Sequence, residues 1–309
     1  MKIFNLNTRS NFNEKDLCLA IGNFDGVHKG HQILINKLLE VSNKNHFKPS
    51  ILSFYPHPRN FFEKTKERLN IITSNEKKEL IKKMGISFFI DYLFNEELSS
   101  MLASEFVEKI LIKQLKIRSI IIGTDFRFGK NRKGDLNLLE NISKKNNFTV
   151  YAIDPLKISN ENKKISSSII RNQIKNGMFE EVNFSLGRNW QMYGEIIRGD
   201  QKARSINFPT ANVLPGNHIL PMKGVYCVNA YIDKQKYYGV SNFGERPTVD
   251  GKKLLLETHI FDFNRDIYGK ELTVEFLTFI RPEQKFENFE ELTIQIKKDI
   301  LRARTYHKI

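Results

Sequence analysis

Short hydrophobic runs alternate with amphipathic stretches through roughly the first 180 residues of the chain. Five runs have the length and composition of buried strands and lie at residues 17–21, 50–54, 88–94, 119–122 and 148–153. Helical spacing separates the runs and is clearest over residues 99–115, where Leu102, Phe106 and Ile110 recur at the interval of a helical turn. Strands that alternate with helices predict a parallel sheet covered by helices, with ligands beyond the carboxyl ends of the strands.

The pattern changes after Gly187. Strand-like runs separated by turn residues lie at residues 190–200, 223–233, 236–244, 254–263 and 271–280. They predict an all-β module, most simply a small closed barrel. Residues 288–304 return to helical spacing, with Asn288 and Glu291 at capping-box positions, and predict a terminal helix. A length of 309 residues also favours two domains, and we expect them to span residues 1–184 and 185–309.

Composition indicates a cytoplasmic protein. No apolar run approaches the roughly 20 residues of a membrane span, and the first residues lack the apolar segment of a secretory signal. Cys18 and Cys227 both lie in strand-like runs, far apart in sequence, which predicts two reduced core residues.

Positive charge exceeds negative charge, with 49 Lys and Arg against 35 Asp and Glu and a formal net charge of +14. The excess favours anionic partners, but the lysines are spread among many asparagines instead of forming one basic arm. We therefore expect dispersed surface charge and no nucleic acid partner. We further expect small-molecule substrates, no membrane partner, and a monomer or weak homo-oligomer.

The stretch IGNFDGVHKGHQ, which begins at Ile21, joins the first of these runs to a predicted helix. A helix amino terminus with sharply turning glycines is a natural seat for phosphate. His28 and His31 could hold the oxygens of a reacting phosphate there. Helix capping or ring packing is the alternative for either histidine, and a zinc site lacks further ligands at suitable spacing.

The stretch GNFDGVHKGH resembles the HxGH signature of nucleotidyltransferases. The segments SFYPHP (53–58), GTDFRFGKNRKGD (123–135) and ISSSIIR (165–171) extend the resemblance to the bacterial bifunctional riboflavin kinase/FMN adenylyltransferase family, also called FAD synthetases. The resemblance covers residues from about 15 to about 305. It implies an α/β, Rossmann-like nucleotidyltransferase domain with a parallel sheet, followed by an all-β riboflavin kinase barrel with a terminal helix.

The resemblance also implies the residues of the adenylyltransferase site. It assigns ATP to Gly22, Asn23, Phe24, Asp25, His28, His31, Asp125, Arg127, Ser167, Ser168 and Arg171. It assigns the flavin to Pro56, Pro58, Phe62, Phe126 and Phe128. The alternatives are N-capping for the two serines, an ordinary turn for the prolines and core packing for Phe126 and Phe128.

In the second domain KARSINFPTANV (202–213) resembles the riboflavin kinase signature. Thr210 and Asn212 offer the hard oxygen ligands that Mg²⁺ prefers, and a capped β-turn is the alternative. The resemblance implies an ATP and Mg²⁺ site at Arg204, Pro209, Thr210 and Asn212. The family usually has glycine where this chain has Ala203 and Asn207, so these two residues put the flexibility of the loop in question.

Glu257 lies in the apolar run LLLETHI, where a carboxylate is costly unless it is used or paired. It is the candidate general base for the primary hydroxyl of the ribityl chain, and a structural salt bridge with a neighbour such as Arg246 is the alternative. His259 would face the same side as packing or support. The resemblance further places Arg281 and Glu283 near the flavin of the kinase site.

We expect the chain to phosphorylate riboflavin to FMN and then to adenylylate FMN to FAD, with Mg²⁺ accompanying ATP. The catalytic candidates are Glu257 in the barrel and His28 and His31 in the first domain. Three alternatives stay open: a single-activity enzyme with a degenerate kinase loop, use of another mononucleotide, and a binding protein for flavin or nucleic acid.

Overall fold

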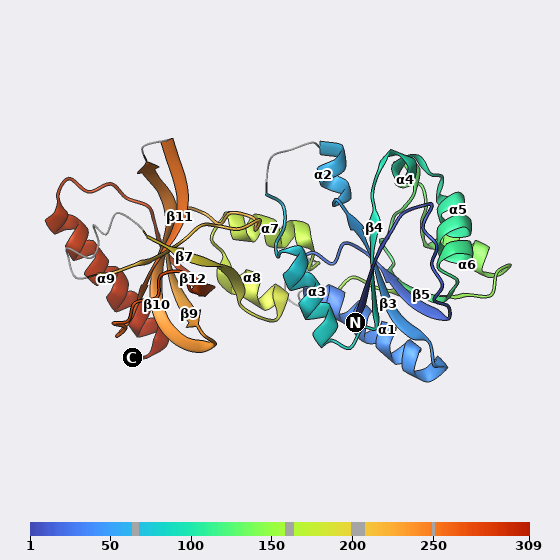
Figure 1. The fold of residues 1–309 in the computed structure, drawn as a ribbon, viewed down its shortest axis with the longest axis horizontal. Coiled ribbons are helices and arrows are strands. Elements are labelled where there is room, and N and C mark those ends of the chain that lie inside the picture. The colour runs from blue at the N-terminus through green and yellow to red at the C-terminus, as the bar shows by residue number, and fades with distance from the viewer. Residues whose placement is uncertain (64–67, 158–163, 199–207, 249–250) are drawn as a thin grey trace. The chain divides into compact units, whose positions relative to one another are not determined.

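The computed structural model describes residues 1–63, 68–157, 164–198, 208–248 and 251–309 (Figure 1). The chain forms two compact units. The first comprises residues 1–67 and 72–167, and the second comprises residues 68–71 and 168–309. The predicted boundary of the functional domains, between residues 184 and 185, stays a prediction.

The first unit is built on a six-stranded parallel sheet with the strand order β1-β4-β3-β2-β5-β6. Its strands are β1 (Lys2–Leu6), β2 (Leu17–Ile21), β3 (Lys48–Tyr55), β4 (Phe88–Leu93), β5 (Ile117–Gly123) and β6 (Thr149–Ile153). The α/β prediction is confirmed. The edge strand β1 is an addition to it, because a five-residue strand with one buried residue leaves little hydrophobic pattern in the sequence.

Helices cover both faces of this sheet. The helices of this unit are α1 (Lys29–Asn45), α2 (Pro58–Glu63), α3 (Ser74–Lys83), α4 (Glu96–Ser100), α5 (Ala103–Glu105), η1 (Phe106–Gln114), η2 (Lys130–Arg132) and α6 (Leu136–Ser143). In Figure 1, α1 and α3 lie on one side of the sheet, and α5 and α6 lie on the other. Right-handed crossovers require this arrangement when the strand order reverses between β2 and β5.

The prediction of one helix over residues 99–115 is wrong in its continuity. α4 ends at Ser100, and Met101 is extended, with φ −67° and ψ 132°. The chain then restarts at α5 and continues as the π-helix η1. Hydrophobic spacing could not reveal the break, because Leu102, Phe106 and Ile110 keep helical spacing in the sequence. In the structure only Phe106 and Ile110 are buried, and Leu102 is exposed.

The second unit is a closed antiparallel barrel with the order β10-β11-β8-β7-β12-β9, which confirms the barrel prediction. Its strands are β7 (Trp190–Ile197), β8 (Ala211–Val213), β9 (Gly224–Ile232), β10 (Gln235–Thr248), β11 (Gly251–Ile260) and β12 (Glu271–Pro282). Its helices are α7 (Ser167–Lys175), whose first residue belongs to the first unit, α8 (Phe179–Leu186) and the terminal α9 (Phe289–His307). Asn288 caps α9 by accepting from the Glu291 N–H, as predicted.

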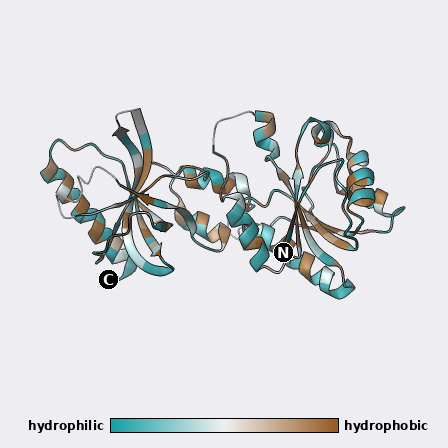
Figure 2. Cartoon of the chain, in the orientation of Figure 1, coloured by the Kyte–Doolittle hydropathy of each residue, from teal (hydrophilic) through white to brown (hydrophobic). Residues whose placement is uncertain are grey.

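Hydrophobic residues follow the strands of both units, whereas the helices show both colours in Figure 2, as amphipathic helices do. α9 packs on the barrel through Ala303, against a cluster that includes Val225, Cys227 and Phe261. Both cysteines are free and buried, as the sequence predicts. No helix among the described residues is long and apolar enough to cross a membrane.

Residues 68–71 are an internal part of the second unit. The indole Nε1 of Trp190 donates to the carbonyl of Ile71 at 2.7 Å, and Nε of Arg171 donates to the carbonyl of Leu69 at 2.6 Å. The carbonyl of Asn70 accepts from the Ile219 N–H at 2.7 Å. The segment therefore provides acceptors for buried donors of the barrel and of α7.

Candidate active sites

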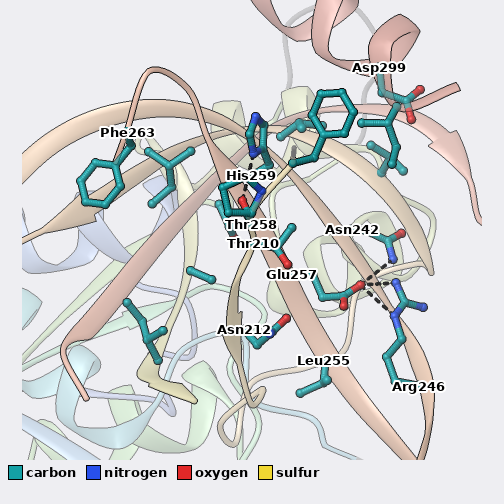
Figure 3. A pocket seen from close by; sticks show the side chains of 18 of the residues that line it. Thr210, Asn212, Asn242, Arg246, Leu255, Glu257, Thr258, His259, Phe263 and Asp299 are labelled. Atoms are coloured by element: carbon teal, nitrogen blue, oxygen red, sulfur yellow. Dashed lines mark hydrogen bonds and ion pairs between the residues drawn. The ribbon is translucent and has the colours of Figure 1, made fainter. Parts of the chain in front are cut away.

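The barrel contains a cavity of about 780 Å³. A row of three polar residues crosses its wall, because Asn242 of β10 and Asn212 of β8 both pair in register with Glu257 of β11. Residues in register on neighbouring strands project from the same face of a sheet. All three side chains accordingly line the cavity, as Figure 3 shows.

The Glu257 carboxylate is held through one of its two oxygens. Oε2 accepts from Nε of Arg246 at 2.8 Å, from Nη2 of the same guanidinium, and from Nδ2 of Asn242 at 3.5 Å (Figure 3). The salt bridge named as the alternative role for Glu257 is therefore present. This salt bridge does not exclude general-base catalysis by Glu257, because Oε1 accepts no hydrogen bond from any described residue.

Arg246 links Glu257 to a second carboxylate. Its Nη1 donates to Oε1 of Glu283 at 3.1 Å and to the carbonyl of Glu245 at 3.0 Å. Burial lowers the pKa of the Arg246 guanidinium, but hydrogen bonds and charges from Glu257 and Glu283 outweigh it, so that the pKa is raised overall. The guanidinium is therefore a permanent positive charge between the two carboxylates.

Asn212 carries a buried oxygen with an unused hydrogen-bonding capacity. Its side chain is 7 % exposed, and its Oδ1 has no hydrogen-bond partner within the described part of the chain. A buried amide oxygen without a hydrogen-bond partner is unfavourable unless a ligand supplies one. Thr210 lies two residues away and lines the same cavity, so a hydroxyl and a carbonyl oxygen, both hard donors, are available together.

The loop before β8 is described only from Phe208 onward. Arg204, Ala203 and Asn207 lie outside the described residues, so the expectations about them are untested. Pro209 is described and its carbonyl contacts Nδ1 of His259 at 2.9 Å. Burial lowers the pKa of His259, although this hydrogen bond acts in the opposite direction. His259 thus supports the loop, in line with the supporting role expected from the sequence.

Arg281 lines the cavity and is fixed there by the terminal helix. Its Nε and Nη2 donate to the carboxylate of Asp299 at 2.8 to 3.0 Å, and Asp299 is almost completely buried. A forked pair of this kind restrains the guanidinium plane. Arg281 and Glu283 both line the cavity, so the structure brings together every described residue that was predicted for the kinase site.

In the first unit the loop between β2 and α1 has an unusual backbone. Phe24 and Val27 have φ values of 50° and 42°, and Gly26 has a φ of 84°. Left-handed conformations at non-glycine residues cost about 1 to 3 kcal/mol each and persist only where their surroundings enforce them. They mark this loop as a candidate site.

His28 is the N-cap residue of α1. Its Nδ1 accepts from the His31 N–H at 3.4 Å, and its ring stacks on the His31 ring at a centroid distance of 3.6 Å. The centroid of the Phe24 ring lies 5.0 Å from that of the His31 ring. The capping and packing alternatives are therefore both present, and the contact of either imidazole with phosphate stays a prediction.

Protein side chains hold the carbonyl groups of this loop. The Ser167 hydroxyl donates to the carbonyl of Asp25 at 2.9 Å, and Gln32 donates to that of Val27 at 2.9 Å. The Ser167 hydroxyl thus bonds the loop rather than its own helix end. Ser168 and Arg171 belong to the second unit, so their predicted meeting with ATP at His28 stays a prediction.

The residues after β5 separate aromatic from charged side chains. Asp125 and Arg127 are exposed, and Asp125 pairs with Lys164 at 2.9 Å. Phe126 stacks on Phe128 at a centroid distance of 5.4 Å, which agrees with the expected alternation. Phe128 is 8 % exposed and belongs to the core of the sheet, as the packing alternative proposes, while Phe126 is only partly buried.

The proline loop follows β3. Pro58 begins α2, Pro56 precedes it after a cis peptide bond, and Phe62 in α2 is 64 % exposed. Phe62 and Phe94 meet edge to face at 5.7 Å. An exposed aromatic side chain of this size beside other aromatics is typical of a surface that accepts a flat ring.

Comparison with known proteins identifies the family. Residues 10–169 match the model of the FAD synthetase family, and residues 186–307 match that of the riboflavin kinase family. Bifunctional riboflavin kinase/FMN adenylyltransferases from Haemophilus influenzae and Bacillus subtilis are 34% and 35% identical to the chain over 93% of its length. The chain belongs to the bifunctional riboflavin kinase/FMN adenylyltransferase family. The alignments also cover 93% and 92% of those two relatives.

A similar crystal structure is described as a macrolide-efflux protein from Streptococcus pneumoniae. It is 30% identical to this member of the bifunctional riboflavin kinase/FMN adenylyltransferase family, with a TM-score of 0.88 and 98% coverage of both chains. The predicted family, its fold class and its two transferase activities are thus confirmed.

Sequence reasoning missed several residues that shape the two sites. Asp299 holds Arg281 and Asn242 holds Glu257, but no role for either residue was predicted from the sequence. Lys77 in α3 donates to the carbonyl of Asn23 at 3.1 Å. A usable signal existed for Lys77, because it lies four residues before the buried Ile81 and therefore on the same face of the helix.

Proposed function

We propose that the barrel transfers the γ-phosphoryl group of ATP to the primary hydroxyl of the ribityl chain of riboflavin, which forms FMN. The observation that carries this proposal is the in-register row of Asn242, Glu257 and Asn212 on the cavity wall. Glu257 takes the hydroxyl proton through Oε1, while Arg246 and Asn242 fix the carboxylate through Oε2. Arg281 and Glu283 orient the flavin.

The donor set at Asn212 and Thr210 suits Mg²⁺. A hydroxyl and an otherwise unused amide oxygen are hard ligands, and a hard ion with its own waters needs only a few protein contacts. When bound, Mg²⁺ neutralises charge on the phosphates of ATP. Thr210 and Asn212 hold the ion, and Arg204 and Pro209 complete the nucleotide site.

The first domain makes FAD. The phosphate of FMN attacks the α-phosphorus of a second ATP, the bond to the β-phosphate oxygen breaks, and pyrophosphate leaves. No protein nucleophile is needed, so orientation and stabilisation of charge carry the reaction. His28, His31 and Arg171 donate to the reacting phosphates.

The remaining adenylyltransferase residues bind the two substrates. The nucleotide contacts Gly22, Asn23, Phe24, Asp25, Asp125, Arg127, Ser167 and Ser168. The flavin ring lies against Pro56, Pro58, Phe62, Phe126 and Phe128. The partly buried Phe126 and the exposed Phe62 offer the free aromatic surface that supports this assignment.

The proposed setting is the cytoplasm, where ATP is the common phosphate donor and the two buried thiols stay reduced. Its substrates are small molecules, with no nucleic acid or membrane partner. The protein acts as a monomer or weak homo-oligomer.

One incubation tests both reactions. Purified protein is mixed with riboflavin, ATP and Mg²⁺, and the flavins are separated over time. FMN should form first and FAD second, with one pyrophosphate released per FAD. FAD formation from supplied FMN without phosphorylation of riboflavin indicates the single-activity alternative, and no turnover of either flavin refutes the proposal. Nicotinate mononucleotide and phosphopantetheine, offered beside FMN, test the choice of mononucleotide.

A further inference from the structure

α3 contains four lysines, and Lys77 differs from its neighbours in what it contacts. The two at the end of the helix are exposed, and Lys78 pairs with Asp91 at 2.9 Å. Lys77 pairs with no carboxylate within the described residues. Its ammonium group donates to two uncharged oxygens, which is an unusual use of a lysine whose ammonium is largely removed from water.

One of the two oxygens belongs to the loop after β2, and the other belongs to the neighbouring strand β3. Nζ donates to the main-chain carbonyl of Asn23 at 3.1 Å and to Oγ of Ser53 at 3.0 Å. Asn23 stands just after β2, in the loop that leads to His28, and Ser53 lies in β3. Lys77 therefore joins the candidate phosphate loop to the rigid sheet beside it.

The loop needs such attachments. Phe24, Gly26 and Val27 all have positive φ, and a strained backbone relaxes unless its surroundings fix it. Side chains from three separate elements hold alternate carbonyl groups of the loop: Lys77 holds residue 23, Ser167 holds residue 25 and Gln32 holds residue 27. Lys77 is the only charged donor among these three, and a charged donor makes the stronger bond.

Charged groups around Lys77 shift the pKa of its ammonium group in both directions. Burial of the ammonium lowers the pKa of Lys77, Asp91 and Asp25 raise it, and Lys78 lowers it further. Since Asp25 belongs to the same loop, the ammonium also attracts the loop through the Asp25 carboxylate. Loss of the proton would weaken both attachments together.

We propose that Lys77 is a positioning residue for the adenylyltransferase reaction, which acts through the carbonyl of Asn23 to hold the loop that carries His28 and His31. Lys77 itself need not touch the nucleotide. The inference rests on the proposed function of this loop in FAD formation.

The test is Lys77→Met, which keeps the length of the side chain and removes the donor. With FMN and ATP as substrates, kcat for FAD formation should fall roughly 10- to 100-fold, which corresponds to about 1.4 to 2.7 kcal/mol. The KM for ATP should change by less than kcat, because the loop is misplaced and its binding groups are kept. Riboflavin phosphorylation by the same molecules is the internal control and should be unchanged.

Two further variants separate positioning from simple loss of charge or packing. Lys78→Met removes the neighbouring lysine, which bonds β4 and not the loop, and should leave FAD formation within about threefold of wild type. Lys77→Arg restores a charged donor and should recover part of the lost kcat. Wild-type FAD formation by a folded Lys77→Met protein would overturn the inference.

A pH profile decides the matter if Lys77→Met loses both activities and so has failed to fold. The lysine can lose its proton at alkaline pH, whereas arginine stays charged. The alkaline limb of kcat for FAD formation should therefore move to higher pH in Lys77→Arg, and coincident limbs overturn the inference. If wild-type protein forms no FAD from FMN at all, the proposed function itself fails, and not merely the role of Lys77.

Discussion

Glu257→Gln separates basicity from shape at the kinase site. Glutamine keeps a carbonyl oxygen that can accept from Nε of Arg246, now 2.8 Å from Glu257, while Arg246 retains Glu283 at 3.1 Å. Weakening the charge-assisted contact between Arg246 and residue 257 should lower the free energy of unfolding by about 1 to 2 kcal/mol. Removing a general base should slow phosphorylation about 10²- to 10⁴-fold, or about 3 to 5.5 kcal/mol in the barrier. The kinetic effect should thus greatly exceed the effect on stability.

The assay follows FMN formed from riboflavin, ATP and Mg²⁺, with FAD formation from supplied FMN as the internal control. Glu275→Gln is a matched control, because Glu275 accepts from Asn189, Asn229 and Tyr231 on the same barrel but does not line the cavity. It should lose comparable stability and keep its kinase rate. A Glu257→Gln enzyme within about fivefold of wild type would refute the reasoning, since general-base catalysis is worth far more than this.

Three other outcomes are expected. His28→Asn keeps a good helix cap but removes the imidazole. FAD formation from FMN should therefore fall about tenfold or more, while riboflavin phosphorylation stays intact. Equal rates of FAD formation in the variant and the wild type would contradict the role of His28. Asn212→Ala removes the unused amide oxygen and should raise the Mg²⁺ concentration for half-maximal kinase activity about tenfold; an unchanged Mg²⁺ requirement removes Asn212 from the metal site. Burial raises the pKa of Cys18, and it raises the pKa of Cys227 to about 12. Neither thiol should therefore react with Ellman's reagent at neutral pH until guanidinium unfolds the protein. Rapid labelling of the folded protein would contradict this burial.

Much of the architecture could be predicted because the buried strands are continuous hydrophobic runs in the sequence. Residues 17–21 are entirely buried, and so is the middle of β5, so the hydrophobic pattern is continuous there. β1 escaped prediction because it is an edge strand with mostly exposed side chains. The break at Met101 escaped because it changes the backbone and leaves the helical spacing of the apolar residues in place.

The sites were predicted to different depths for a physical reason. Thr210 and Asn212 are close in sequence, so a short motif reveals them. The meeting of Asn212 with Glu257 and Asn242 depends on strand register between segments that are far apart in the chain. The spacing of Lys77 from Ile81 could have placed it on the buried face of α3, but its bonds to Asn23 and Ser53 join segments that are far apart in the chain.

The short segment of residues 68–71 limits how this chain can be divided. A gene fragment that starts at residue 185 encodes the barrel strands but not Ile71, whose carbonyl accepts from the buried indole of Trp190. Such a buried N–H without an acceptor costs about 1 to 3 kcal/mol. Kinase fragments should therefore express as marginal proteins, and grafting residues 68–71 back through a linker should restore them. Residues 68–71 thus lie within the first domain in the linear sequence but belong to the compact unit that forms the barrel.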